Sequence, residues 1–168
     1  DLCSENNMPA IAVTDTNNLF GALEFSETIS KSGIQPIIGA KIKIKTPNEF
    51  IIDPENEIYR YFYINLLSQN EVGYKNLLYL NSISYTQNSS ENAFITLDQL
   101  FMRKEGLIAL TGGYQNIFNN LLFHNRYDWA SDLIKKFKQE FVSNLYIEIQ
   151  RIGDPIQIQS EKLLLKLS

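Results

Sequence analysis

Short apolar runs alternate along this chain with longer segments that carry apolar residues at helical spacing. Five runs rich in Ile, Val, Tyr and Phe predict strands, at 9–13, 35–45, 60–68, 106–110 and 145–150. Four longer segments with apolar residues on one stripe predict helices, at 19–32, 70–85, 114–123 and 127–140. Strands separated by helices of this length pair in parallel through right-handed crossovers. The sequence therefore predicts an α/β fold with mainly parallel strands.

Polar residues at the expected helix ends support these boundaries. Asn17 or Asn18 is expected to cap the helix at 19–32, and Gly33 stands where that helix should stop. Asn70 is expected to cap the next helix, and Thr96 a short helix that runs to residue 102. The last segment, SEKLLLKLS, predicts an amphipathic helix.

Composition limits the class of protein. With 168 residues, of which 44% are apolar, the chain suits one domain with a buried core. A net charge of −4 gives no general attraction to nucleic acid or to acidic membranes. The single cysteine, and the lack of a signal peptide or membrane-length apolar stretch, predict a cytoplasmic protein. The first residue is Asp1, so we expect a piece of a longer protein.

Three local patterns admit two interpretations each. Lys41, Lys43 and Lys45 share one strand face, which predicts a solvated, aggregation-resistant edge or a nucleic-acid contact; the solvated edge is the simpler interpretation. The TGG at 111–113 predicts a turn, because it lacks the spacing and the lysine of a phosphate-binding loop. His124 lies between two helices and predicts a surface or cap position rather than a metal ligand.

Five blocks of sequence resemble a known family, in order and at its spacing. They are AIAVTDTNNLFGALEF, GIQPIIGAKI, NLLSQNEVGYKNLLYLNSISY, LDQLFMRKEGLIALTGG and NLYIEIQRIGDPIQ. They resemble the polymerase-and-histidinol-phosphatase (PHP) domain of bacterial DNA polymerase III alpha subunits. The resemblance implies a distorted seven-stranded β/α barrel. Residues 1–168 would form its middle, with the first and last strands missing.

Metal-bearing PHP domains hold several divalent ions between His, Asp and Glu side chains at strand ends. The resemblance places six positions of this chain at such a site. Asp15 keeps the family's aspartate, although an acceptor at the start of the following helix is the simpler interpretation. Thr16 stands where the metal-bearing pattern has His, and Lys41 where it has Glu.

The other three positions follow the same trend. Tyr63 and Ile152 replace two further histidines, while Glu148 keeps its carboxylate. Whether Glu148 is a ligand or a structural hydrogen-bond acceptor stays open. The whole chain has one histidine and one cysteine, too few imidazoles and thiols for a multi-metal centre. We therefore expect a vestigial site with no metal or other cofactor.

The resemblance implies that the parent is the DNA-directed DNA polymerase (a nucleotidyltransferase) of bacterial replication, with its Mg²⁺ site outside this chain. The domain would then be an inactive scaffold and a docking surface for a proofreading exonuclease subunit. Other implied partners are the rest of the alpha subunit, other replisome proteins and, through the parent, DNA; no membrane is implied. Two alternatives stay open: a metal-dependent phosphoesterase or 3'-5' exonuclease that uses Asp15 and Glu148, and the product of a decayed gene. Whether this chain alone is an enzyme stays open too.

Overall fold

The computed structural model describes residues 2–88, 93–113 and 116–167. The strands are β1 (Ala10–Thr16), β2 (Gln35–Lys45), β3 (Tyr61–Ser68), β4 (Leu107–Leu110) and β5 (Leu145–Tyr146). The helices are α1 (Leu2–Glu5), α2 (Ala22–Lys31), α3 (Glu71–Thr86), α4 (Leu97–Met102), α5 (Ile117–Phe123), α6 (Tyr127–Phe141) and α7 (Pro155–Leu167). Short 3-10 turns lie at Asn48–Phe50, Glu57–Arg60 and Val142–Asn144. Residues 114, 115 and 168 of the expected helices lie outside the described residues.

The strands form one five-stranded sheet in the order β1-β2-β3-β4-β5. The outer pairs β1/β2 and β4/β5 are parallel, whereas β3 is antiparallel to both β2 and β4. Four of the five strands thus run in one direction. The predicted α/β class is confirmed. Among the described residues the sheet is open, since β1 and β5 each pair with one neighbour, and the seven-stranded barrel stays a prediction.

Strand β3 departs from the predicted parallel pairing for a reason visible in its connections. Between β2 and β3 the described chain forms only 3-10 turns, so no helix carries it back along the sheet before β3 begins. After β3 the chain runs through α3 and α4 and returns to the first turn of α3, where Gly106 lies against Gly73. Strand β4 therefore starts beside the end of β3, where Leu107 pairs with Ser68.

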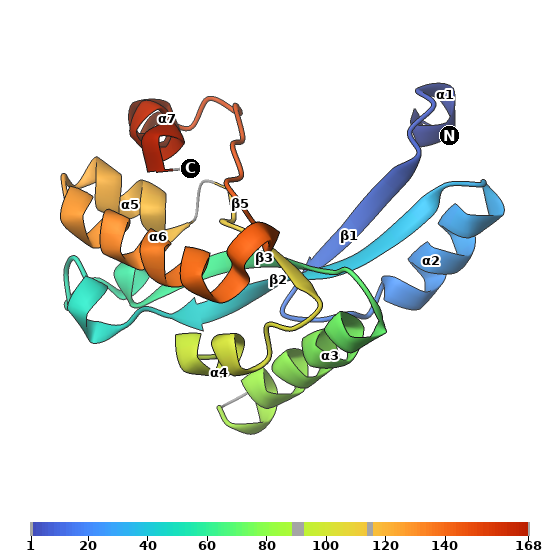
Figure 1. Cartoon of the computed structure of the whole chain (residues 1–168), viewed down its shortest axis with the longest axis horizontal. Helices are drawn as coiled ribbons and strands as arrows, with labels where there is room; N and C mark the ends of the chain where they lie inside the picture. Colours follow the sequence, from blue (N-terminus) through green and yellow to red (C-terminus); the bar gives the residue numbers. More distant parts are fainter. Residues whose placement is uncertain (1, 89–92, 114–115, 168) are drawn as a thin grey trace.

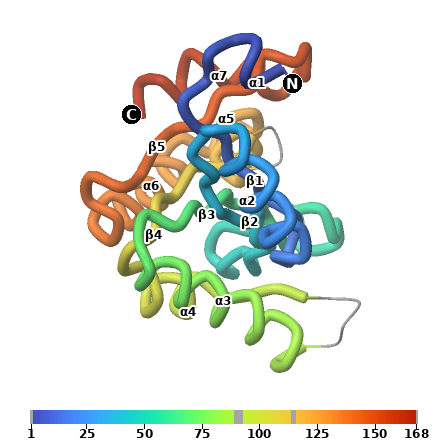
Figure 2. Tube along the Cα trace, turned by 90° about the vertical axis from the view of Figure 1, so that its right-hand side faces the viewer, coloured from blue at the N-terminus to red at the C-terminus, as the bar shows by residue number. Residues whose placement is uncertain are grey.

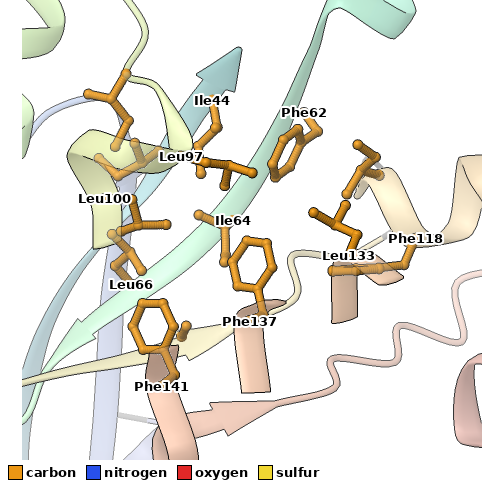
Figure 3. Close-up of a cluster of buried hydrophobic side chains, with 14 of the residues drawn as sticks. Ile44, Phe62, Ile64, Leu66, Leu97, Leu100, Phe118, Leu133, Phe137 and Phe141 are labelled. Atoms are coloured by element: carbon orange, nitrogen blue, oxygen red, sulfur yellow. The ribbon is translucent and has the colours of Figure 1, made fainter. Parts of the chain in front are cut away.

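One face of the sheet carries the hydrophobic core. Its fully buried strand residues include Ala40, Ile42, Ile44, Ile64, Leu66, Leu107 and Ala109. In Figure 3, Phe137 of α6 points toward Ile64 of β3. Leu100 of α4 lies beside Leu66 in the same view, so helices from different parts of the chain bury this face.

The helices lie in two groups around the sheet. In Figure 1, α5, α6 and α7 lie above the left half of the sheet, whereas α2, α3 and α4 lie below the sheet, with α2 at the right. Figure 2 shows the same separation from the side, with α3 and α4 at the bottom and α7 at the top. No helix in the described part of the chain is both long and apolar enough to cross a membrane.

The predicted caps meet different outcomes. Asn70 accepts a bond from the Gly73 backbone N–H, and Thr96 forms a complete capping box, so both predictions are confirmed. The prediction for Asn17 or Asn18 is wrong, because α2 begins later, after Gly21. Asn17 is instead buried with φ 53°, and its side chain bonds to the backbone of Lys43 and of Ala93. Asn17 thus ties the β1–α2 loop to β2 and to the segment before α4.

Candidate sheet-end site

Strand register aligns one residue from each strand in a row across the sheet. Thr16 pairs with Lys41, Lys41 with Asn65, Asn65 with Leu110, and Leu110 with Tyr146. Paired residues project to the same side of a sheet, and neighbours along a strand project to opposite sides. Lys41 and Asn65 therefore share the face opposite the core, in the row where β1, β4 and β5 end.

The chain beyond β5 brings Glu148 to this row. Its backbone N–H donates to Oγ1 of the buried Thr111 at 2.9 Å, so a side chain takes the place of a strand acceptor. The backbone pairing of β5 with β4 ends at this point, so the predicted strand 145–150 is confirmed only for Leu145–Tyr146. Gly112 has φ 80°, and a Cβ there would overlap the carbonyl of Tyr63. The TGG segment thus packs closely on β3 through Gly112.

Five side chains form what we call the sheet-end cluster: Lys41, Tyr63, Asn65, Glu148 and Gln150. Asn65 Nδ2 donates to Glu148 Oε2 at 2.7 Å, and Gln150 Nε2 donates to the other carboxylate oxygen. The Lys41 ammonium lies 4.7 Å from the centroid of the Tyr63 ring, within cation–π range. The cluster therefore combines one carboxylate, one ammonium, two amides and one phenol ring.

The cluster is half-buried, and this shapes its electrostatics. Burial lowers the pKa of the Lys41 ammonium below its ordinary value, while the negative charge of Glu148 acts in the opposite direction. Asn65 Oδ1 is buried and makes no hydrogen bond within the described structure. The carboxylate of Glu148 thus receives two amide donors and the field of one lysine.

The structure brings together only part of the predicted set. Lys41, Tyr63 and Glu148 meet in the cluster, and Thr16 is exposed at the position paired with Lys41. Asp15 pairs with Ala40, on the core side, and accepts the Gly21 backbone N–H at 3.2 Å. This bond agrees with its interpretation as a helix-start acceptor.

Ile152 does not join the cluster. Its side chain is 68% exposed, in the loop that precedes α7. His124 also lies elsewhere, at the end of α5, where its Nε2 is 2.9 Å from the Tyr59 hydroxyl.

Sequence reasoning gave no role to three members of this region: Asn65, Thr111 and Gln150. Asn65 had a local signal, since it is an amide in the middle of the apolar strand YFYINLLS. Thr111 and Gln150 lie at the ends of the predicted strands 106–110 and 145–150, and Gln150 is two residues from Glu148. The contact between Thr111 and Glu148, however, joins residues 37 positions apart and had no signal in the sequence.

These residues do not fit a divalent cation. The described residues contain no group of three or more His, Cys, Asp or Glu side chains placed to hold a metal ion. In the cluster itself the one carboxylate already accepts two amide hydrogens. The Lys41 ammonium adds a positive charge that repels a second cation.

Comparison with known proteins agrees with this architecture. The sequence pattern of the PHP domain matches residues 1–152. The chain is 37% identical to DNA polymerase III subunit alpha of Borreliella burgdorferi over 147 residues, which is 88% of this chain. The corresponding protein of Caulobacter vibrioides is 34% identical over 161 residues, or 95% of this chain, and that of Haemophilus influenzae 30% identical over 166 residues, or 99%.

The matched regions are a small part of these relatives. This chain spans 13% of the Borreliella protein and 14% of each of the other two. The match to the domain pattern nevertheless runs from residue 1 to residue 152 of 168 and includes all five strands. The chain therefore belongs to the PHP domain family.

Proposed function

We propose that this PHP domain belongs to a replicative bacterial DNA polymerase, where it is a hydrolytically inactive scaffold and a docking surface for a proofreading exonuclease subunit. The observation that carries the inactive role is the half-buried Lys41 ammonium, which lies 4.7 Å from the Tyr63 ring centroid. It lies on the same face as Asn65, the donor to Glu148, where the family's metal-bearing members are expected to gather carboxylates. The similarity to DNA polymerase III alpha subunits supports the replicative role.

The catalytic centre of such a parent would lie outside these residues, in the remainder of a protein of which the chain spans 13–14% in the compared relatives. The parent would be a DNA-directed DNA polymerase that uses Mg²⁺ for nucleotidyl transfer. Its partners would include the rest of the alpha subunit, other replisome proteins and DNA. Replication of a bacterial chromosome would place it in the cytoplasm.

Exposed apolar side chains support a docking role. Phe20 is 90% exposed and Leu23 is 72% exposed, at the start of α2. Large apolar groups on a surface are a common feature of contacts between proteins.

Two measurements test the proposal in the full-length parent. Hydrogen–deuterium exchange on addition of the organism's exonuclease subunit should show protection within residues 1–168, and no protection there would contradict docking. With Mn²⁺ or Zn²⁺, phosphate release from p-nitrophenyl phosphate should equal that of an Asp15→Ala, Glu148→Gln double variant.

A second candidate is a metal-dependent phosphoesterase or 3'-5' exonuclease. Two carboxylates, Asp15 and Glu148, remain at the expected strand ends, and this observation favours it. Metal-dependent release of phosphate or nucleotides by the parent, abolished by Asp15→Ala, would establish this function instead.

A further inference from the structure

We propose that the Lys41 ammonium is a built-in counter-ion for Glu148 and takes the electrostatic place of a divalent cation in this domain. The inference deepens the proposed function. It rests on that function only in assuming that Glu148 is not a metal ligand. It adds a positive role for Lys41: the attraction between its charge and Glu148 helps to hold the sheet end that a bound metal would otherwise hold together.

The position of Glu148 creates the need for a counter-ion. Its backbone is fixed by Thr111, and its two carboxylate oxygens accept one amide hydrogen each, from Asn65 and Gln150. Neutral amides satisfy lone pairs but do not cancel a net charge in a half-buried place. A positive group close by therefore stabilises the ionised carboxylate.

Lys41 supplies that group from the other side of β3. It stands on β2, directly paired with Asn65, so one register position carries both the ammonium and the amide that serve Glu148. The Tyr63 ring, 4.7 Å from the ammonium, favours a lysine that lies along the sheet rather than out in water. The field of Glu148 acts on Lys41 in turn.

Lys43, two residues after Lys41 on β2, offers a matched comparison. The Lys43 ammonium lies 4.2 Å from the centroid of the Tyr61 ring, so it makes the same kind of cation–π contact on the same face. Lys43 pairs with Tyr63, whereas Lys41 pairs with Asn65, the donor to Glu148. Lys43 thus separates the effect of the ring contact from the effect of the Glu148 charge on Lys41.

A cation that already belongs to the chain also disfavours a second one. An ammonium and a divalent ion beside the same carboxylate repel each other, most strongly where burial reduces screening by water. The cluster should therefore keep its structure with and without divalent metal.

Hydrogen–deuterium exchange in the full-length parent tests this inference at the backbone N–H groups of Glu148 and Gln150. Both are protected by side chains, since they donate to Thr111 Oγ1 and to Gln157 Oε1. We expect Lys41→Met to speed exchange of the peptide 145–151 on the order of five-fold, through local opening. Lys43→Met should change it by less than about two-fold, and Lys41→Arg should restore slow exchange because it keeps the charge.

Equal exchange in the Lys41→Met and Lys43→Met variants would overturn the inference, as would slower exchange of this peptide in the wild type on addition of Mn²⁺. These outcomes are distinct from failure of the proposed function. Loss of exonuclease docking would leave the exchange pattern unchanged, and hydrolysis would be seen as metal-dependent phosphate release.

Discussion

Asn65 of β3 donates its side-chain amide to the carboxylate of Glu148 at 2.7 Å and thereby links the middle of the sheet to the segment beyond β5. The two residues are 83 positions apart in the chain. Only two residues of β5 pair with β4 through the backbone. The Asn65 bond and the contact between Thr111 and Glu148 therefore attach the following segment to the sheet through side chains.

Removal of the Asn65 amide should weaken this link. In Asn65→Ala the Glu148 carboxylate keeps its charge but loses a donor in a half-buried place, so we expect a loss of about 1–2 kcal/mol in the free energy of unfolding. Asn76→Ala is the matched control, since its amide donates to the Glu105 carbonyl on an exposed surface and should cost less than about 0.5 kcal/mol. Urea unfolding followed by circular dichroism measures both. Similar losses in the two variants would contradict the role given to Asn65.

A second prediction concerns Gly73, in the first turn of α3. A Cβ at this position would overlap the backbone of Gly106, so the glycine is required by close packing rather than by its own dihedral angles. We expect Gly73→Ala to cost roughly 3 kcal/mol, near the upper range for overpacking. Gly33→Ala is a useful comparison, because it strains a φ of 71° in open space and should cost about 1 kcal/mol. Equal losses in thermal unfolding would show that the chain shifts to accept the methyl group.

Periodicity predicted the elements of this fold well, and their directions less well. The alternation in QPIIGAKIKIK identifies β2 together with its buried face, because successive side chains of a strand project to opposite faces of the sheet. The antiparallel direction of β3 follows from the link between β2 and β3, which contains only 3-10 turns and no crossover helix. No residue in β3 itself encodes that link.

The candidate site divides along the same line. Lys41, Tyr63 and Glu148 were identified as related positions through the resemblance to the PHP family, and the structure places them in one cluster. Asp15 was expected beside them, yet strand alternation turns it to the core side with Ala40. Whether these are vestigial metal positions stays a prediction.

The role of Asp15 gives a third prediction. Its carboxylate accepts the Gly21 backbone N–H just before α2, so Asp15→Ala should cost about 1 kcal/mol. Asp15→Asn keeps an acceptor oxygen and should recover most of that loss. Thermal unfolding with and without EDTA separates a helix-start acceptor from a metal ligand. A wild type destabilised by EDTA, with an Asp15→Ala variant that is insensitive to it, would identify Asp15 as a ligand.

The last prediction follows from the pKa of Lys41, which burial lowers from the ordinary value of 10.5 against the opposing effect of Glu148. A lysine with a lowered pKa releases its proton more readily in the folded state than in the unfolded state. Between the lowered pKa and 10.5 the unfolded chain therefore binds more protons, and the contribution of Lys41 to stability rises with pH across that window, because the burial cost of the ammonium outweighs its attraction to Glu148. Below the lowered pKa both states are protonated and the contribution is constant.

Competitive labelling with acetic anhydride along a pH series, read by mass spectrometry, measures this pKa directly, because only the neutral amine reacts. We expect the labelling midpoint of Lys41 to lie below 10.5 in the wild type and lower still in Glu148→Gln, which removes the negative charge that raises the pKa. Glu161→Gln is the control, since that carboxylate pairs with Arg151 and should leave the midpoint unchanged. A Glu148→Gln midpoint equal to or above that of the wild type would mean that the carboxylate does not stabilise the Lys41 ammonium. Glu148 would then need another source of positive charge.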